Sequence, residues 1–237
     1  MFDYQQKVVM VTGAAGNLGA AVVSAYREAG ARLILVDYKE DRLQRTFPGM
    51  ADSREHFLAG GTDLTRAESV IEMAGKAVDR LGQIDVLVHT VGGFTMGDRV
   101  HELDADTWRG MLELNALTFL NISRAVVPHM LERGAGKIVS IGARPSLGGK
   151  PRMGAYSVAK SAVLRLTESM SAELKGEGIN VNCVLPGTID TPDNREAMPD
   201  ANYSKWVQPE SLADAILFLT SRAARDIHGV ALPVYGS

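Results

Sequence analysis

The chain has few of the features that mark several large protein classes. Its one cysteine, Cys183, lies between Val181 and Val184, so no intrachain disulfide can form and a buried thiol is expected. No apolar run is long enough to cross a bilayer, and the first residues lack the basic and then apolar order of a signal peptide. We therefore expect a cytoplasmic protein with no membrane-spanning segment.

Basic tracts and metal-ligand patterns are also missing. The net charge is −3, and no cluster of Lys and Arg suits the phosphates of a nucleic acid. The five histidines are not spaced like metal ligands, so no metal site is expected. These absences favour a protein that acts on small molecules.

The apolar sequence is sufficient for one substantial core. Because 46% of the 237 residues are hydrophobic, we expect residues 1–237 to form a single domain. Strand-like apolar runs alternate with helical patterns: strands at 8–12, 32–36, 56–59, 84–88, 137–141 and 179–185, and helices at 20–29, 66–81, 107–131 and 154–175. Since the strands are nearly all apolar, the sequence predicts an α/β fold, a doubly wound Rossmann domain with a parallel sheet of about seven strands.

Two local features complete this interpretation. Thr65 is suited to cap the helix that follows it. Residues 190–208 are rich in Pro, Asp and Asn with a few large apolar side chains, and we expect them to form a loop that acts as a substrate lid.

The first predicted strand ends in a glycine-spaced turn that opens a helix. Gly13, Gly16 and Gly19 allow a tight turn and a close approach of the backbone to a ligand, and Asn17 and Leu18 lie between the last two glycines. Free N–H groups at the start of the helix face negative charge with no side chain in the way. The turn is therefore predicted to bind the pyrophosphate of a dinucleotide.

Asp37 follows the second strand, about twenty residues past these glycines. An acid at this distance accepts hydrogen bonds from the ribose hydroxyls of NAD and repels the 2′-phosphate of NADP. The turn itself contains no Arg or Lys to offset that repulsion, so NAD is the expected cofactor. Lys39 and Arg42 either soften this discrimination or are simply solvated charges.

Tyr156 and Lys160 are four residues apart on a predicted helix and share one of its faces. An ammonium beside a phenol favours the phenolate, so we expect Lys160 to lower the pKa of Tyr156. Such a tyrosine could exchange a proton near neutral pH.

The order of these motifs resembles the short-chain dehydrogenase/reductase family over essentially the whole chain. The residues that carry the resemblance are the glycine-rich turn, Asp37, Asp63-Leu64, Asn115, Tyr156-Ser157-Val158-Ala159-Lys160 and Pro186-Gly187.

The resemblance implies an NAD(H)-dependent oxidoreductase that acts on a small carbonyl or alcohol. Tyr156 would exchange a proton with the substrate oxygen, Lys160 would lower its pKa and hold the nicotinamide ribose, and Asn115 would support a water-mediated proton path. Further cofactor contacts are implied at Asp63 and Leu64 beside the adenine, at Ile189 and Thr191 beside the carboxamide, and at Gly92, Pro186 and Gly187.

Three positions depart from the family pattern. Asn17 replaces a glycine of the turn, and His89 opens the turn that is rich in asparagine elsewhere in the family, either as a structural substitute or as a catalytic base. Ala143 occupies the position of the catalytic serine. Loss of that donor can cost about 3 kcal/mol, so either Ser146 or Ser140 supplies a hydroxyl, or the substrate does not need it.

The last possibility has a specific form. Dihydropteridine reductases also carry alanine at this position, and the chain is similar to them in its turn at 92–94 and in residues 188–206. A quinonoid pterin is already an activated electrophile, whereas Asn115 and Pro186-Gly187 resemble the general family. Pterin reduction is therefore the alternative activity.

Other expectations concern the substrate and partners. Phe94, Met198, Tyr203 and Trp206 could form an apolar lid, with Arg144 and Arg152 available for an anionic group. The family resemblance implies a homodimer or homotetramer. A dinucleotide sensor without turnover is a further alternative, against which the tyrosine, lysine and asparagine argue together.

Overall fold

The computed structural model describes residues 2–236, so Met1 and Ser237 of the predicted domain lie outside the described residues. The strands are β1 (Val8–Thr12), β2 (Arg32–Val36), β3 (His56–Ala59), β4 (Val86–His89), β5 (Gly136–Ile141), β6 (Ile179–Pro186) and β7 (Ala231–Val234). The helices are α1 (Asn17–Glu28), α2 (Arg42–Thr46), α3 (Ala67–Leu81), α4 (Ala105–Leu112), α5 (Thr118–Arg133), α6 (Gly154–Leu174), α7 (Pro192–Ala197) and α8 (Pro209–Thr220).

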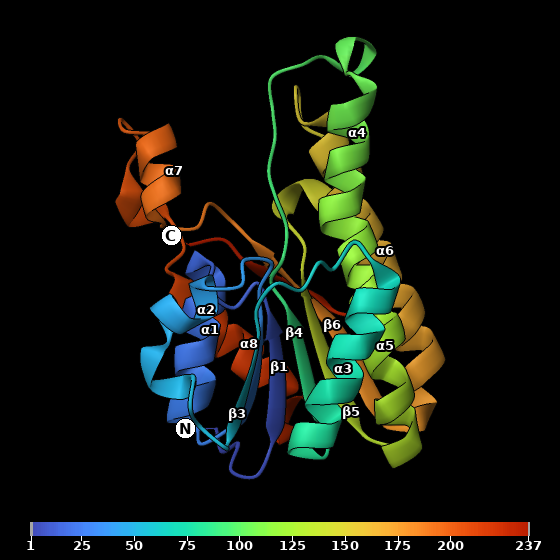
Figure 1. Cartoon of the computed structure of the whole chain (residues 1–237). Helices are drawn as coiled ribbons and strands as arrows, with labels where there is room; N and C mark the ends of the chain where they lie inside the picture. The colour runs from blue at the N-terminus through green and yellow to red at the C-terminus, as the bar shows by residue number, and fades with distance from the viewer. Residues whose placement is uncertain (1, 237) are drawn as a thin grey trace.

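All strand pairs are parallel, in the order β3-β2-β1-β4-β5-β6-β7. Helices α1, α2 and α8 cover one face of this sheet, and α3, α5 and α6 cover the other (Figure 1). The strand order reverses between β1 and β4, which is where doubly wound sheets bind ligands beyond the carboxyl ends of their strands. The predicted fold class, a single α/β Rossmann-type domain with a seven-stranded parallel sheet, is confirmed.

Each central strand supplies both cores by alternating its side chains. On β1, Val9 and Val11 belong to the core under α1 and α8, whereas Val8 and Met10 belong to the core under α3 and α5. Both sets are fully buried. This two-sided burial explains why the strands are continuous apolar runs, and it makes the sheet a rigid platform for the loops at its carboxyl edge.

The helix predicted at 107–131 is interrupted near its middle. Helix α4 passes into a π-helical segment, Glu113–Leu117, before α5 begins. Asn115 lies in that segment and is fully buried. A π-helical turn inside an α-helix is frequently found at a functional site.

Two local predictions are wrong. Thr65 does not cap α3, whose first flanking residue is Arg66; instead the Thr65 N–H and hydroxyl both donate to Asp63 Oδ1, at 2.9 and 2.7 Å. The segment 190–208 is not an irregular loop throughout, since it contains α7. The Thr191 hydroxyl accepts a hydrogen bond from Asn194 N–H at 3.2 Å and Pro192 occupies the first helical position, so this helix has a regular start.

Among residues 2–236, no helix is both long and apolar enough to cross a membrane.

Candidate active site

The glycine-spaced turn lies at the carboxyl end of β1. Gly13 adopts φ 67°, a left-handed conformation that favours glycine, and the Gly16 N–H donates to its carbonyl at 2.9 Å. A Cβ on Gly19 would lie 2.1 Å from the same carbonyl oxygen, so only glycine allows α1 to approach the turn so closely. Helix α1 begins at Asn17 without a side-chain cap, which leaves its first N–H groups available to an anion.

The Asn17 side chain connects this turn to the segment 190–208. Its Nδ2 donates to Asp193 Oδ2 of α7 at 3.3 Å. Sequence reasoning did not find this contact, because it joins residues far apart in the chain and needs the position of α7. Asn17 thus has a partner that a glycine at the same position would lack.

Asp37 is buried at the carboxyl end of β2, beside the turn. Its carboxylate accepts from the N–H groups of Ala15 at 3.3 Å and Lys39 at 3.1 Å, and the Arg42 guanidinium lies 3.9 Å away. These contacts fix the carboxylate next to the start of α1. Arg42 is therefore an ion-pair partner of Asp37, while Lys39 contributes through its backbone.

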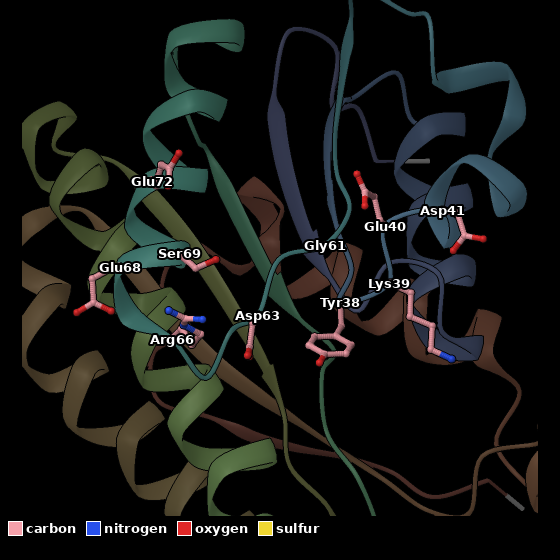
Figure 2. Close-up of a pocket in the computed structure, with 10 residues that line it drawn as sticks. All are labelled: Tyr38, Lys39, Glu40, Asp41, Gly61, Asp63, Arg66, Glu68, Ser69 and Glu72. Carbon is pink, nitrogen blue, oxygen red and sulfur yellow. The ribbon is translucent and has the colours of Figure 1, made fainter.

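A pocket of 780 Å³ adjoins Asp37 and opens between the end of β2 and the start of α3 (Figure 2). Its lining is polar and rich in acidic groups: Tyr38, Lys39, Glu40, Asp41, Gly61, Asp63, Arg66, Glu68, Ser69 and Glu72. Leu64 is buried behind it, where its carbonyl accepts from Asn121 Nδ2 at 2.9 Å. Asp63 lines this pocket and lies beyond the same carboxyl edge of the sheet as Asp37.

Gly92, Asn115 and Lys160 meet at the carboxyl end of β4. A Cβ on Gly92 would lie 2.7 Å from Asn115 Oδ1 and 2.8 Å from Lys160 Nζ. Asn115 is held by Gly93, which donates its N–H to Oδ1 at 3.1 Å and accepts from Nδ2 at 3.2 Å. The π-helical segment thus brings the Asn115 amide to the turn after β4. Asn115 and Lys160, which the family resemblance implied as catalytic residues, therefore lie close together.

Lys160 points toward β5. Its Nζ donates to the Ile141 carbonyl at 2.9 Å, and burial lowers the pKa of Lys160 to about 8. The acceptor is a backbone atom, so no residue type in the sequence could indicate it. The lysine therefore connects α6 to the end of β5.

Tyr156 lies one turn before Lys160 on α6, and its ring meets the ring of Phe94 edge to face. Burial raises the pKa of Tyr156 to about 12. The expectation that Lys160 lowers this pKa is wrong for this arrangement, because burial of the phenol dominates and the ammonium is directed to Ile141. The phenol is therefore protonated at neutral pH.

Ser146 and Ser140, the two serines considered as substitutes at Ala143, each have a hydrogen-bond partner within the fold. Ser146 is buried, and its Oγ accepts from the Ala143 N–H at 3.0 Å, which closes the short turn after β5. Ser140 is also buried, and its hydroxyl is hydrogen-bonded to Thr167 at 2.8 Å. Ser146 stays the nearer candidate in the chain, because its hydroxyl accepts from Ala143 and keeps its own proton to donate.

His89 is fully buried at the end of β4. Its Nδ1 pairs with the Thr12 hydroxyl at 2.8 Å and its Nε2 with the Thr118 hydroxyl at 3.3 Å. Burial, with a smaller effect of the Lys160 ammonium, lowers the pKa of His89 to about 3. A neutral imidazole that joins β1, β4 and α5 fits a structural substitute better than a catalytic base.

The positions predicted for the nicotinamide end follow β6. Gly187 packs against the backbone of Tyr235, whose carbonyl oxygen would lie 2.6 Å from an added Cβ, so the close approach requires glycine after Pro186. Ile189 pairs with Val207, and Thr191 is the N-cap residue of α7. These residues surround the base of the segment 190–208 on the same edge of the sheet as Tyr156.

A family model described as short chain dehydrogenase matches residues 7–202. The chain belongs to this family. It is an oxidoreductase of the short-chain dehydrogenase type, and the expected family membership is confirmed.

Relatives match the chain over nearly its full length. The protein is 31% identical to 2-(S)-hydroxypropyl-CoM dehydrogenase 3 of Xanthobacter autotrophicus, with 98% of this chain and 96% of the relative covered. It is 32% identical to cis-4-hydroxycyclohexanecarboxylate dehydrogenase of Sinomonas cyclohexanicum, with the same coverage of both chains. A solved structure of carveol dehydrogenase from Mycobacterium avium, in complex with NAD, shares 25% identity and a TM-score of 0.89 over 99% of this chain and 98% of that chain.

Proposed function

We propose that this short-chain dehydrogenase uses NAD(H) to interconvert a small alcohol and the corresponding carbonyl compound. The observation that carries the proposal is the meeting of Lys160 and Asn115 at Gly92, one helical turn from the protonated Tyr156 phenol. Names of relatives agree in kind, since they describe dehydrogenases of hydroxyl-bearing compounds and a 3-oxoacyl reductase.

The backbone fits a dinucleotide. The positive φ of Gly13, the contact that only glycine allows at Gly19, and the uncapped start of α1 form an anion-binding turn. Bound NADH supplies the hydride for carbonyl reduction. We expect Gly13, Gly16, Asn17, Leu18 and Gly19 to bind the pyrophosphate. Asp63 and Leu64 would border the adenine, and Gly92, Pro186, Gly187, Ile189 and Thr191 would border the nicotinamide half.

Tyr156 has the proton that carbonyl reduction requires. Its raised pKa keeps the phenol protonated, so it can donate to the oxygen of a bound carbonyl. Lys160, held by Ile141, would bind the nicotinamide ribose, and Asn115 would order the path by which the proton is replaced. Phe94 excludes water from one side of the phenol.

Asp37 supports a preference for NAD over NADP. Its buried carboxylate is held beside the start of α1 by hydrogen bonds from Ala15 and Lys39, and an acid at the end of this strand repels a 2′-phosphate. Arg42 offsets part of this charge from 3.9 Å. We expect Asp37→Ala to gain affinity for NADP relative to NAD, measured by cofactor titration. An unchanged ratio of the two affinities would contradict this preference.

A homo-oligomer is supported by apolar side chains that remain exposed on neighbouring helices. Trp108 on α4, Leu120 on α5 and Val158 on α6 are all more than a third exposed. Contiguous exposed apolar surface commonly marks an interface, and Trp108 and Val158 line the same hollow. Light scattering of the purified protein would show a dimer or tetramer if this proposal holds, and a monomer at micromolar concentration would contradict it.

Dihydropteridine reduction is the second candidate, because Ala143 itself has no hydroxyl and an aromatic ring lies against Tyr156. The deciding experiment follows NADH oxidation with a quinonoid dihydropterin, a panel of ketones and acetoacetyl thioesters. Turnover of carbonyls supports the proposed activity, and fast turnover of the pterin alone supports the second candidate.

The same assay with Tyr156→Phe separates an enzyme from a sensor. Loss of a general acid commonly costs 10²–10⁴-fold, so we expect kcat/KM to fall by about that factor while NADH affinity, measured by fluorescence, is unchanged. Tight NADH binding by the wild-type protein without turnover of any compound would overturn both enzymatic proposals.

A further inference from the structure

The segment between Ala143 and Tyr156 is strongly cationic. It carries Arg144, Lys150 and Arg152 and no acidic residue, although the whole chain has a net charge of −3. All three side chains are exposed. A local concentration of positive charge beside a proposed proton donor would attract an anionic substrate.

The turn that carries Arg144 is fixed to the helix that carries Tyr156. The turn spans Arg144–Ser146 and directly follows β5. Two hydrogen bonds connect this region to α6: Lys160 Nζ donates to the Ile141 carbonyl at 2.9 Å, and Ser161 Oγ donates to the Ser146 carbonyl at 3.0 Å. Arg144 therefore belongs to a turn that is fixed to the helix of the proposed proton donor.

The guanidinium of Arg144 lies over the ring of Tyr235, 5.3 Å from its centroid. The Tyr235 backbone packs against Gly187, so this ring is next to the proposed nicotinamide end of the site. Stacking on a ring uses the face of a guanidinium and leaves the N–H groups at its edge able to bind a planar oxyanion.

Unlike Arg42 and Arg195, Arg144 has no carboxylate partner within ion-pair distance among residues 2–236. Arg42 pairs with Asp37, and Arg195 pairs with Asp190 through two contacts of 2.6 and 2.7 Å. Arg152 is also without an acidic partner there, but its Nη1 donates to the Gly97 carbonyl at 2.6 Å. Gly97 lies in the loop that carries Phe94, so Arg152 stabilises this loop.

We propose that the substrate of this enzyme is an anionic carbonyl or alcohol compound, and that Arg144 binds its carboxylate or similar planar oxyanion. The inference rests on the proposed oxidoreductase function and names its substrate class. Anchoring the far end of the substrate fixes the orientation of its carbonyl at Tyr156, where Ala143 supplies no hydroxyl to do so.

The experiment compares keto acids with neutral derivatives of the same skeleton. Acetoacetate, 4-oxopentanoate and 5-oxohexanoate are each tested with their amides and methyl esters, with NADH and the wild-type enzyme. Hydrogen bonds to charged groups are the strong ones, so kcat/KM for at least one acid should exceed that of its amide by about 10–100-fold. In Arg144→Gln this advantage should disappear through a raised KM, while activity on the amide is unchanged.

Lys150→Gln is the matched control, because it removes the same charge from the same segment. It should retain most of the preference for the acid, and Arg144→Lys should retain part of it. NADH affinity and the thermal unfolding temperature of Arg144→Gln should equal those of the wild type, which excludes misfolding and a cofactor role.

The outcomes separate two failures. If acids and amides are reduced equally well, or if Arg144→Gln lowers activity on all of them alike, the anionic substrate class is wrong while the oxidoreductase function stands. A rise in the NADH dissociation constant of Arg144→Gln would also overturn the assignment to substrate. If no ketone in the panel is reduced, the proposed function fails together with the inference.

Discussion

The ring of Phe94 meets the ring of Tyr156 edge to face, with centroids 4.9 Å apart and planes at 83°. Phe94 itself is 56% exposed, so it acts as a partial cover between the phenol and solvent. The burial that raises the pKa of Tyr156 to about 12 therefore includes a side chain that can be removed without opening the core.

Phe94→Ala should lower the pKa of Tyr156, because water reaches the phenol and stabilises its anion. Carbonyl reduction needs the protonated phenol, so activity falls as pH rises through this pKa. We expect the alkaline limb of the pH profile of kcat/KM to move to lower pH by on the order of one unit.

Met96→Ala is the control for that shift, since Met96 is similarly exposed on the same loop and has no ring to pack against Tyr156. Its alkaline limb should coincide with that of the wild type. Equal limbs for wild type and Phe94→Ala would show that Phe94 does not shield the phenol.

Gly92→Ala tests the meeting point of Asn115 and Lys160. The added Cβ would lie 2.7 Å from the amide oxygen and 2.8 Å from the ammonium nitrogen, so one or both must move. A displacement of about 1 Å at a catalytic group can cost 10²-fold, and we expect a loss of about that size in kcat/KM for any substrate of the enzyme.

Gly148→Ala provides the comparison, because a Cβ at Gly148 meets no heavy atom within 4 Å. It should have wild-type kinetics. Wild-type kinetics in Gly92→Ala as well would mean that the positions of Asn115 and Lys160 do not limit turnover.

The buried strands were the most predictable part of the fold. The predicted bounds 8–12 and 32–36 coincide with β1 and β2, because strands buried on both faces are continuous apolar runs bounded by polar residues. The bounds 56–59 also coincide with β3, although this edge strand is mostly half-buried. The π-helical segment at Asn115 was not predictable, since it depends on hydrogen bonds to Gly93 across the site and not on local periodicity. Helix α7 did have a sequence signal, the Thr191-Pro192 start, which the polar composition of its segment obscured.

The site shows the same division. Candidate residues could be predicted from motifs, and in the structure three of them, Gly92, Asn115 and Lys160, lie together. The direction of the Tyr156 pKa shift could not be predicted, because it depends on how deeply the phenol is buried and where the Lys160 ammonium points. Neither property follows from a spacing of four residues on a helix.

His89 makes the stability of the protein sensitive to acid. Its pKa is about 3 in the folded protein, against about 6.5 in an unfolded chain. Between these values the unfolded chain binds a proton that the folded protein does not, so stability falls as pH drops below 6.5. From pH 7 to pH 5 this one group should lower the free energy of unfolding by about 2 kcal/mol.

His89→Asn removes that titration, and urea unfolding at pH 7 and pH 5 measures its effect. At pH 7 the variant should be less stable than the wild type, because it loses the imidazole bonds to Thr12 and Thr118. At pH 5 the difference should shrink by about 2 kcal/mol, since only the wild type loses stability through His89. His101→Asn, at an exposed position, should lose as much free energy of unfolding between pH 7 and pH 5 as the wild type does. If wild type and His89→Asn lose the same stability between pH 7 and pH 5, the buried imidazole is not the acid-sensitive group.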